Sequence, residues 1–134
     1  LVELGMYSPE EKKQILVTYA ADNFLKAKPN LSQAHRVRTV MQSKYFLENK
    51  AVWLNEDGVL EIDMDKMVPT AQKMLAEIIR VQLSKDFATG EKYVLDNFVW
   101  TDEMEIISKK LKEIDKSLNG TLKTPLADKL AQEI

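Results

Sequence analysis

Apolar residues recur at three- and four-residue intervals along most of the chain, which is the spacing of one face of an α-helix. We expect a first helix over residues 9–26, because Ser8, Pro9 and Glu11 supply a cap, a helix-first proline and a capping-box glutamate. Its buried face is expected to consist of Leu16, Tyr19, Ala20, Asn23, Phe24 and Ala27.

A second helix is expected to follow the break at Pro29-Asn30 and to end at Glu48. Asn30 or Ser32 can cap its first turn, since both side chains accept hydrogen bonds from backbone N–H groups. Its apolar stripe is expected to be Ala34, Val37, Val40, Met41 and Tyr45. After it, the β-prone runs 51–54 and 59–62 flank the turn residues Asn55-Glu56-Asp57-Gly58, which predicts one β-hairpin.

Three further helices are expected. One covers residues 65–84, a shorter one follows a cap at Asp86, and the last runs from residue 101 to a stop at Asn119-Gly120. A short tail helix is expected to begin at Thr124-Pro125. The residues expected on the buried faces of the three helices are Met67, Ala71, Met74, Leu75, Ile78 and Val81; Phe87, Val94 and Phe98; and Ile107, Leu111, Ile114 and Leu118.

These elements define a mainly α fold, a single helical domain over residues 1–134 with about five helices and one β-hairpin. The composition agrees, because 45% of the residues are hydrophobic and there are only 4 Gly and 4 Pro. A chain of 134 residues is long enough for one core but not for two. Because it opens with Leu1 and carries no leader, we expect a piece of a longer protein. Such a terminus gives no information on localisation, and we favour the cytoplasm without support from it.

Charge and composition narrow the possible partners and cofactors. With 19 basic and 21 acidic residues the net charge is −2, so neither nucleic acid nor an anionic membrane is expected as a partner. No apolar run approaches the roughly 18 residues that span a bilayer. The chain has no Cys and a single His, so we expect it to hold no metal by itself.

One polar cluster could carry binding chemistry. His35, Arg38, Thr39 and Gln42 are spaced three, four and seven residues apart, which places them on one face of the second helix. An imidazole and a guanidinium can both donate hydrogen bonds to a carbonyl or carboxylate. We therefore take His35, Arg38 and Gln42 as candidate substrate-binding residues. On composition and spacing alone, the preferred interpretation is a solvated helix face that carries a histidine by chance.

Gln33-Ala34-His35, followed by a basic residue and a long helix, resembles the Q-A-H-M-x-x-R stretch near the C-terminal end of the dipeptidyl-peptidase III zinc metallopeptidases. The similarity continues on both sides of this stretch, in the same order as in that family, and extends to about Leu118. The other segments that resemble the family are residues 1–5, 19–31, 60–67 and 85–90.

The resemblance implies that the chain is the C-terminal helical portion of such a peptidase and lines its substrate cleft. Its partners would be the remainder of the parent polypeptide and an oligopeptide substrate, and His35 would contact that substrate or the transition state. The family holds zinc with an H-E-x-x-G-H helix and an E-E-x-x-A-D/E helix, both upstream of the segment resembled here, and neither pattern occurs in this chain. Zinc is therefore expected in the parent protein, and the chain is not expected to be catalytic alone.

The sequence departs from the family four residues after the histidine, where Thr39 stands in place of the usual arginine. Arg38 lies one position earlier, rotated by roughly 100° around the helix. Either Arg38 replaces the arginine with a different reach, or this branch recognises another peptide or has lost peptidase activity. A hypothesis of another class is a helical interaction or regulatory domain with no catalytic role, in which His35 is an incidental surface residue.

Overall fold

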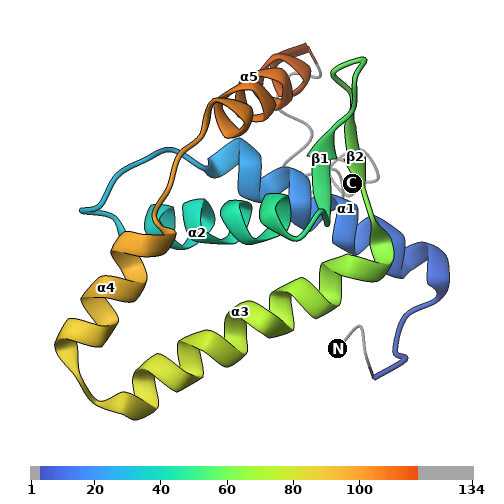
Figure 1. Cartoon of the computed structure of the whole chain (residues 1–134). Helices are drawn as coiled ribbons and strands as arrows, with labels where there is room; N and C mark the ends of the chain where they lie inside the picture. The colour runs from blue at the N-terminus through green and yellow to red at the C-terminus, as the bar shows by residue number, and fades with distance from the viewer. Residues whose placement is uncertain (1–3, 118–134) are drawn as a thin grey trace, which may run out of the picture.

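The computed structural model describes residues 4–117, which form five helices and one two-stranded sheet (Figure 1). Along the chain they are α1 (Pro9–Lys26), α2 (Ala34–Glu48), β1 (Val52–Leu54), β2 (Leu60–Ile62), α3 (Met64–Ser84), α4 (Phe87–Asn97) and α5 (Asp102–Ser117). The mainly α fold with one hairpin is confirmed for this part of the chain. Leu118, the stop at Asn119-Gly120 and the tail helix at Thr124-Pro125 lie outside the described residues.

The helices pack in an order that differs from their order in the chain. α1 lies between α2 and α5 and contacts both, while α3 runs along the opposite side of α2 (Figure 1). α4 follows the far end of α3 and contacts α2, where Lys44 donates to Asn97 at 3.1 Å and Tyr93 packs against Met41 and Tyr45. Within residues 4–117, no helix is both long enough and apolar enough to cross a membrane.

One large core joins most of these elements. It gathers side chains from α1, α2, the hairpin, the first turns of α3 and one face of α5, including Phe24, Phe46, Val52, Met67, Met104 and Ile107. A second, smaller cluster of Met41, Tyr45 and Met74 lies between α2 and α3, with Tyr93 of α4 packed against it. The core thus fixes α2 from both sides.

The helix starts show which local signals decide the fold. At α1 the expected capping box forms, with Glu11 N donating to Ser8 Oγ at 3.2 Å and Ser8 N donating to the Glu11 carboxylate at 2.8 Å. The expected cap of α2 is wrong, because its N-cap is Gln33, which makes no side-chain cap bond. Asn30 instead accepts hydrogen bonds from the backbone and hydroxyl of Ser32 at 3.0 and 2.6 Å, closing a local turn that competes with capping.

The hairpin pairs Val52 with Ile62 and Leu54 with Leu60 in an antiparallel register. Its turn needs Gly58, whose φ of 71° lies in the left-handed region that favours glycine. α3 then begins at Met64, one residue before the expected start, because the Asp63 carboxylate accepts from the N–H groups of Asp65 and Lys66.

Several expected core positions are wrong. The residues expected to be buried that the structure leaves exposed are Tyr19, Ala34, Ala71, Leu75, Phe87 and Ile114. α4 has no buried residue, and Val94 and Phe98 are only half-buried, because α4 packs against its neighbours on one side and faces solvent on the other. Phe87 is the first residue of α4, and 83% of its surface is exposed.

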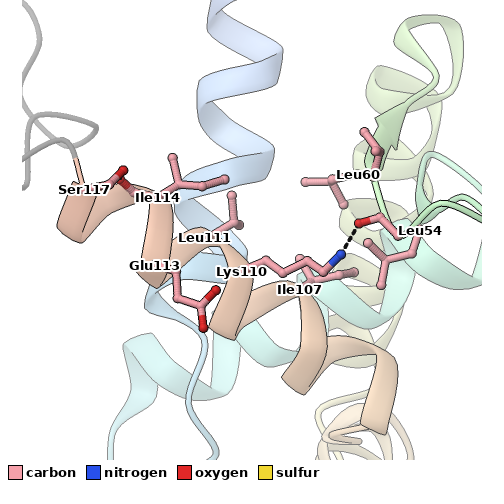
Figure 2. Close-up of a pocket in the computed structure, with 10 residues that line it drawn as sticks. Leu54, Leu60, Ile107, Lys110, Leu111, Glu113, Ile114 and Ser117 are labelled. Atoms are coloured by element: carbon pink, nitrogen blue, oxygen red, sulfur yellow. Dashed lines mark hydrogen bonds between the residues drawn. The ribbon is translucent and has the colours of Figure 1, made fainter.

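The stripe of α5 continues past the core into an open apolar groove beside the hairpin. Leu54 and Leu60 face Ile107 and Leu111 across it, and the groove has a volume of about 520 Å³ (Figure 2). The ammonium group of Lys110 donates to the carbonyl of Gly58 and so ties α5 to the hairpin turn.

Candidate functional site

Helix α2 is held on two sides by core side chains, which fixes the side chains along its surface. The second core cluster holds Met41 and Tyr45 on one side, and the main core holds Phe46 on the other. Val37 is half-buried against the second cluster, and Met41 is buried, with 5% of its surface exposed. The expectation that Met41 turns into the core is confirmed.

The structure does not place all four members of the expected polar cluster on one open face. His35 and Arg38 are exposed and Gln42 is half-buried, but Thr39 is buried, with only 5% of its surface exposed. Its hydroxyl donates to the carbonyl of Arg36 at 3.0 Å, one turn back in the same helix. Thr39 therefore presents no free donor at the surface, and its inclusion in an open polar face is a correction to the expectation.

His35 and Arg38 line one pocket together, at the start of α2. This basic pocket has a volume of about 510 Å³, and it is lined by Leu25, Lys26, Lys28, Gln33, His35, Arg36, Arg38, Thr39 and Lys112. Arg38 also lines a smaller pocket of about 150 Å³, shared with Gln42 and the aromatic rings of Tyr19, Tyr45 and Phe46. Arg38 is thus the residue that connects the basic pocket with the second, more apolar pocket.

The charges of the basic pocket are only partly neutralised. Lys26 pairs with Asp22 at 2.8 Å, one turn earlier in α1. Lys112 lies in the field of Glu105, whose pKa is held below its usual range by the hydrogen bond from Trp100, with smaller contributions from Lys109 and Lys112. Lys28, Arg36 and Arg38 have no ion pair with any residue between 4 and 117.

The start of α2 adds positive potential to the same place. The first turn of α2 contains no acidic residue, and the Gln33 side chain does not cap it. The free N–H groups of a helix start carry a partial positive charge. Donors therefore outnumber acceptors here, and the arrangement suits a carbonyl or carboxylate oxygen better than a cation.

In the second pocket, Gln42 has an unsatisfied polar atom. Its Oε1 is buried without a hydrogen-bond partner in the part of the chain that the structure describes. A buried polar atom without a partner costs free energy, commonly about 1–3 kcal/mol. An incoming N–H group, such as that of a peptide backbone, could satisfy this oxygen once the Gln42 amide turns toward the pocket.

Spacing along α2 was enough to pair His35 with Arg38, but it missed the rest of the basic pocket. Arg36 stands directly after the histidine and Lys28 lies in the loop before α2, and the expectation used neither. Lys112 comes from α5, far away in the sequence, so no pattern within α2 could have identified it. Tertiary packing of α5 on α1 brings it to the pocket.

Among residues 4–117, no group of three or more His, Cys, Asp or Glu side chains is arranged to hold a metal ion. A scan against protein-family models, a search of curated proteins and a search of solved structures find no match to this chain.

Proposed function

We propose that the chain is the C-terminal helical portion of a dipeptidyl-peptidase III-like zinc metallopeptidase, and that α2 lines its substrate cleft. The observation that carries the proposal is the exposed His35, which stands beside an open basic pocket on the helix that bears the Gln33-Ala34-His35 stretch. A donor in this position can reach a substrate, whereas a histidine buried in the core could not.

His35 would act by hydrogen bonding. An imidazole N–H can donate to the oxygen of the scissile carbonyl while negative charge develops on it. This bond strengthens as the charge grows, so its benefit falls mainly on the transition state and appears in turnover. The exposed position of His35 leaves both ring nitrogens open to solvent or ligand, since no described residue hydrogen-bonds to it.

Arg38 would take the part of the arginine that the family carries one position later. The hydroxyl of Thr39 is engaged by the Arg36 carbonyl, so Thr39 offers the substrate nothing. Arg38 is exposed and lines the pockets on both sides of it. With Gln42 in the second pocket, it could hold the carbonyl and N–H groups of an extended peptide along α2.

Zinc would have to be bound outside the described residues. No group of ligands suited to a metal lies within residues 4–117, so these residues do not fit a zinc site. The role of His35 is therefore derived without any step on the metal, and the parent polypeptide is the proposed source of the zinc.

A helical interaction domain is the second candidate function. It is favoured by large apolar side chains that α3 and α4 leave exposed, at Leu75, Ile79, Leu83, Phe87 and Leu95. Exposed apolar side chains gathered in one region often mark a surface that another protein covers. In this hypothesis α3 and α4 would be the functional surface and α2 would have no ligand.

The parent gene separates the two candidates. We expect the sequence upstream of this chain to encode an H-E-x-x-G-H helix, and the intact product to release dipeptides from oligopeptides only when zinc is bound. An upstream sequence without that helix, together with a product that cleaves no peptide, would favour the interaction domain and overturn the proposal.

A further inference from the structure

The basic pocket carries more positive charge than its surroundings neutralise. Five cationic side chains and His35 line it, and none of its lining residues is acidic. Asp22 neutralises Lys26, and Glu105 on α5 offsets part of the charge of Lys112. The remaining three cations have no ion pair with a described residue.

This concentration of charge is local. The chain as a whole has a net charge of −2, so its composition alone would place an acidic neighbour beside most basic residues. Unneutralised like charges in one pocket repel each other, and walls of low dielectric strengthen their field. An anion bound there would relieve that repulsion, which is a direct source of affinity.

The geometry suits a carboxylate. The cations come from four parts of the chain: Lys26 from α1, Lys28 from the loop before α2, Arg36 and Arg38 from α2, and Lys112 from α5. They therefore surround a bound group from more than one direction. A guanidinium binds both oxygens of a carboxylate through parallel N–H bonds, and Arg36 is half-buried, which limits its freedom to swing away.

The pocket also has the size of a side-chain site. Its volume of about 510 Å³ falls in the range of small-ligand pockets. Leu25 and Thr39 are among the residues that line it. A polyanion would need a basic surface that extends well beyond one pocket, and the net negative charge of the chain argues against that.

We propose that the basic pocket holds a side-chain carboxylate of a bound peptide, so that the chain selects acidic peptides. This inference rests on the proposed function, since it takes a peptide as the ligand of α2. It adds the substrate class, and it assigns roles to Arg36, Lys28 and Lys112, which the spacing of α2 does not suggest.

The test is a binding titration in which each probe is added to the chain of residues 1–134 at low salt. Binding is monitored by the changes in the backbone amide chemical shifts of the chain. The probes are two end-blocked peptides, Gly-Glu-Glu-Gly and Gly-Gln-Gln-Gly, and inorganic phosphate. We expect the glutamate peptide to bind about tenfold more tightly than the glutamine peptide, because only the former forms charge-assisted bonds. The shifts are expected to centre on the start of α2.

The variant Arg36→Gln with Lys112→Gln should abolish this preference. Its control is Lys12→Gln with Lys13→Gln, which removes the same charge from an exposed part of α1 away from the pocket and should keep the preference. Thermal melts of both double variants check that the fold is intact. Equal binding of the two peptides, or a preference that survives Arg36→Gln with Lys112→Gln, would overturn the inference.

Phosphate supplies a third outcome. If phosphate binds at the start of α2 more tightly than the glutamate peptide, the pocket is a phosphate site and the carboxylate assignment is wrong. These results are independent of peptidase activity. A parent protein that cleaves no peptide would refute the proposed function while the carboxylate preference of the chain could still hold.

Discussion

Tyr45 joins three helices through one hydroxyl group. Lying on α2, it donates to the Glu77 carboxylate of α3 and stands 2.9 Å from the hydroxyl of Tyr93 on α4. Burial, with the bonds to these two partners, raises the pKa of Tyr45 well above its ordinary value. The phenol is therefore neutral at neutral pH and donates to Glu77.

Tyr45→Phe should lower the free energy of unfolding by about 1–3 kcal/mol, because the partly buried Glu77 carboxylate loses a donor. Tyr93→Phe serves as the comparison, and we expect a smaller loss, since Glu77 keeps its bond to Tyr45. Urea unfolding of both variants measures the difference. A Tyr45→Phe protein as stable as the wild type would show that this cluster does not hold α3 and α4 to α2.

Glu105 makes the stability of the fold depend on pH in the acidic range. Trp100 Nε1 donates to its carboxylate at 2.8 Å, and this bond lowers the pKa of Glu105 below the ordinary 4.5. A carboxyl with a lowered pKa in the folded state stabilises the fold above its unfolded pKa, and this contribution is lost as the pH falls through the folded value.

We therefore expect the melting temperature of the wild type to fall more steeply than that of Glu105→Gln between about pH 5 and about pH 3. The glutamine keeps an oxygen that Trp100 can donate to, but it does not titrate. Glu113→Gln on the same helix is the control and should follow the wild type. Parallel acid profiles for wild type and Glu105→Gln would refute the role of Glu105.

At the scale of elements, a phenylalanine contributes very differently to stability in α1 and in α4. Phe24 of α1 is completely buried in the main core, whereas 83% of the surface of Phe87 of α4 is exposed. Removing a buried phenylalanine leaves a cavity and loses its transfer free energy, while removing an exposed one does neither.

Phe24→Ala should cost about 3–5 kcal/mol of unfolding free energy, and Phe87→Ala should change it by less than about 0.5 kcal/mol. Chemical denaturation of the two variants, measured side by side, decides the matter. A loss of several kcal/mol in Phe87→Ala would mean that α4 buries this ring in solution and that the expected buried position is right after all.

How far the sequence predicts each element depends on whether the signal is local. The start of α1 matches the expectation because Ser8, Pro9 and Glu11 act within one turn, and its end at Lys26 matches because Pro29-Asn30 follow closely. The cap of α2 is missed because Asn30 has a competing local partner in Ser32. The exposure of Phe87 is missed because a helical period predicts which face is apolar but not whether another element covers that face.

In the candidate site, too, local signals could be predicted from the sequence and tertiary packing could not. The period of one helix predicts that His35 and Arg38 lie near each other, and both line the basic pocket. The period also predicts that Thr39 shares their open face, which is wrong, because packing turns the Thr39 hydroxyl to the Arg36 carbonyl. Lys112 could not be predicted at all, since only the packing of α5 on α1 brings it to α2.

At the scale of the whole molecule, the core holds α2 in place while its N-terminal end faces outward. α1 and α3 contact α2 from two sides, and the basic pocket lies where the end of α1, the start of α2 and α5 meet (Figure 1). A rigid helix that presents exposed donors beside a pocket is a suitable wall for a substrate cleft. Among the residues of α2, His35 is therefore the one on which the proposed function depends most.

The most direct test is the turnover of His35→Ala in the intact parent protein. We expect the turnover number to fall by roughly 10²–10³-fold, the usual cost of removing one donor to a developing negative charge. The melting temperature should hardly change, because His35 is exposed and bonded to no described residue. Lys12→Ala, on an exposed part of α1, is the control and should keep full turnover. Normal turnover in a stable His35→Ala protein would contradict the account.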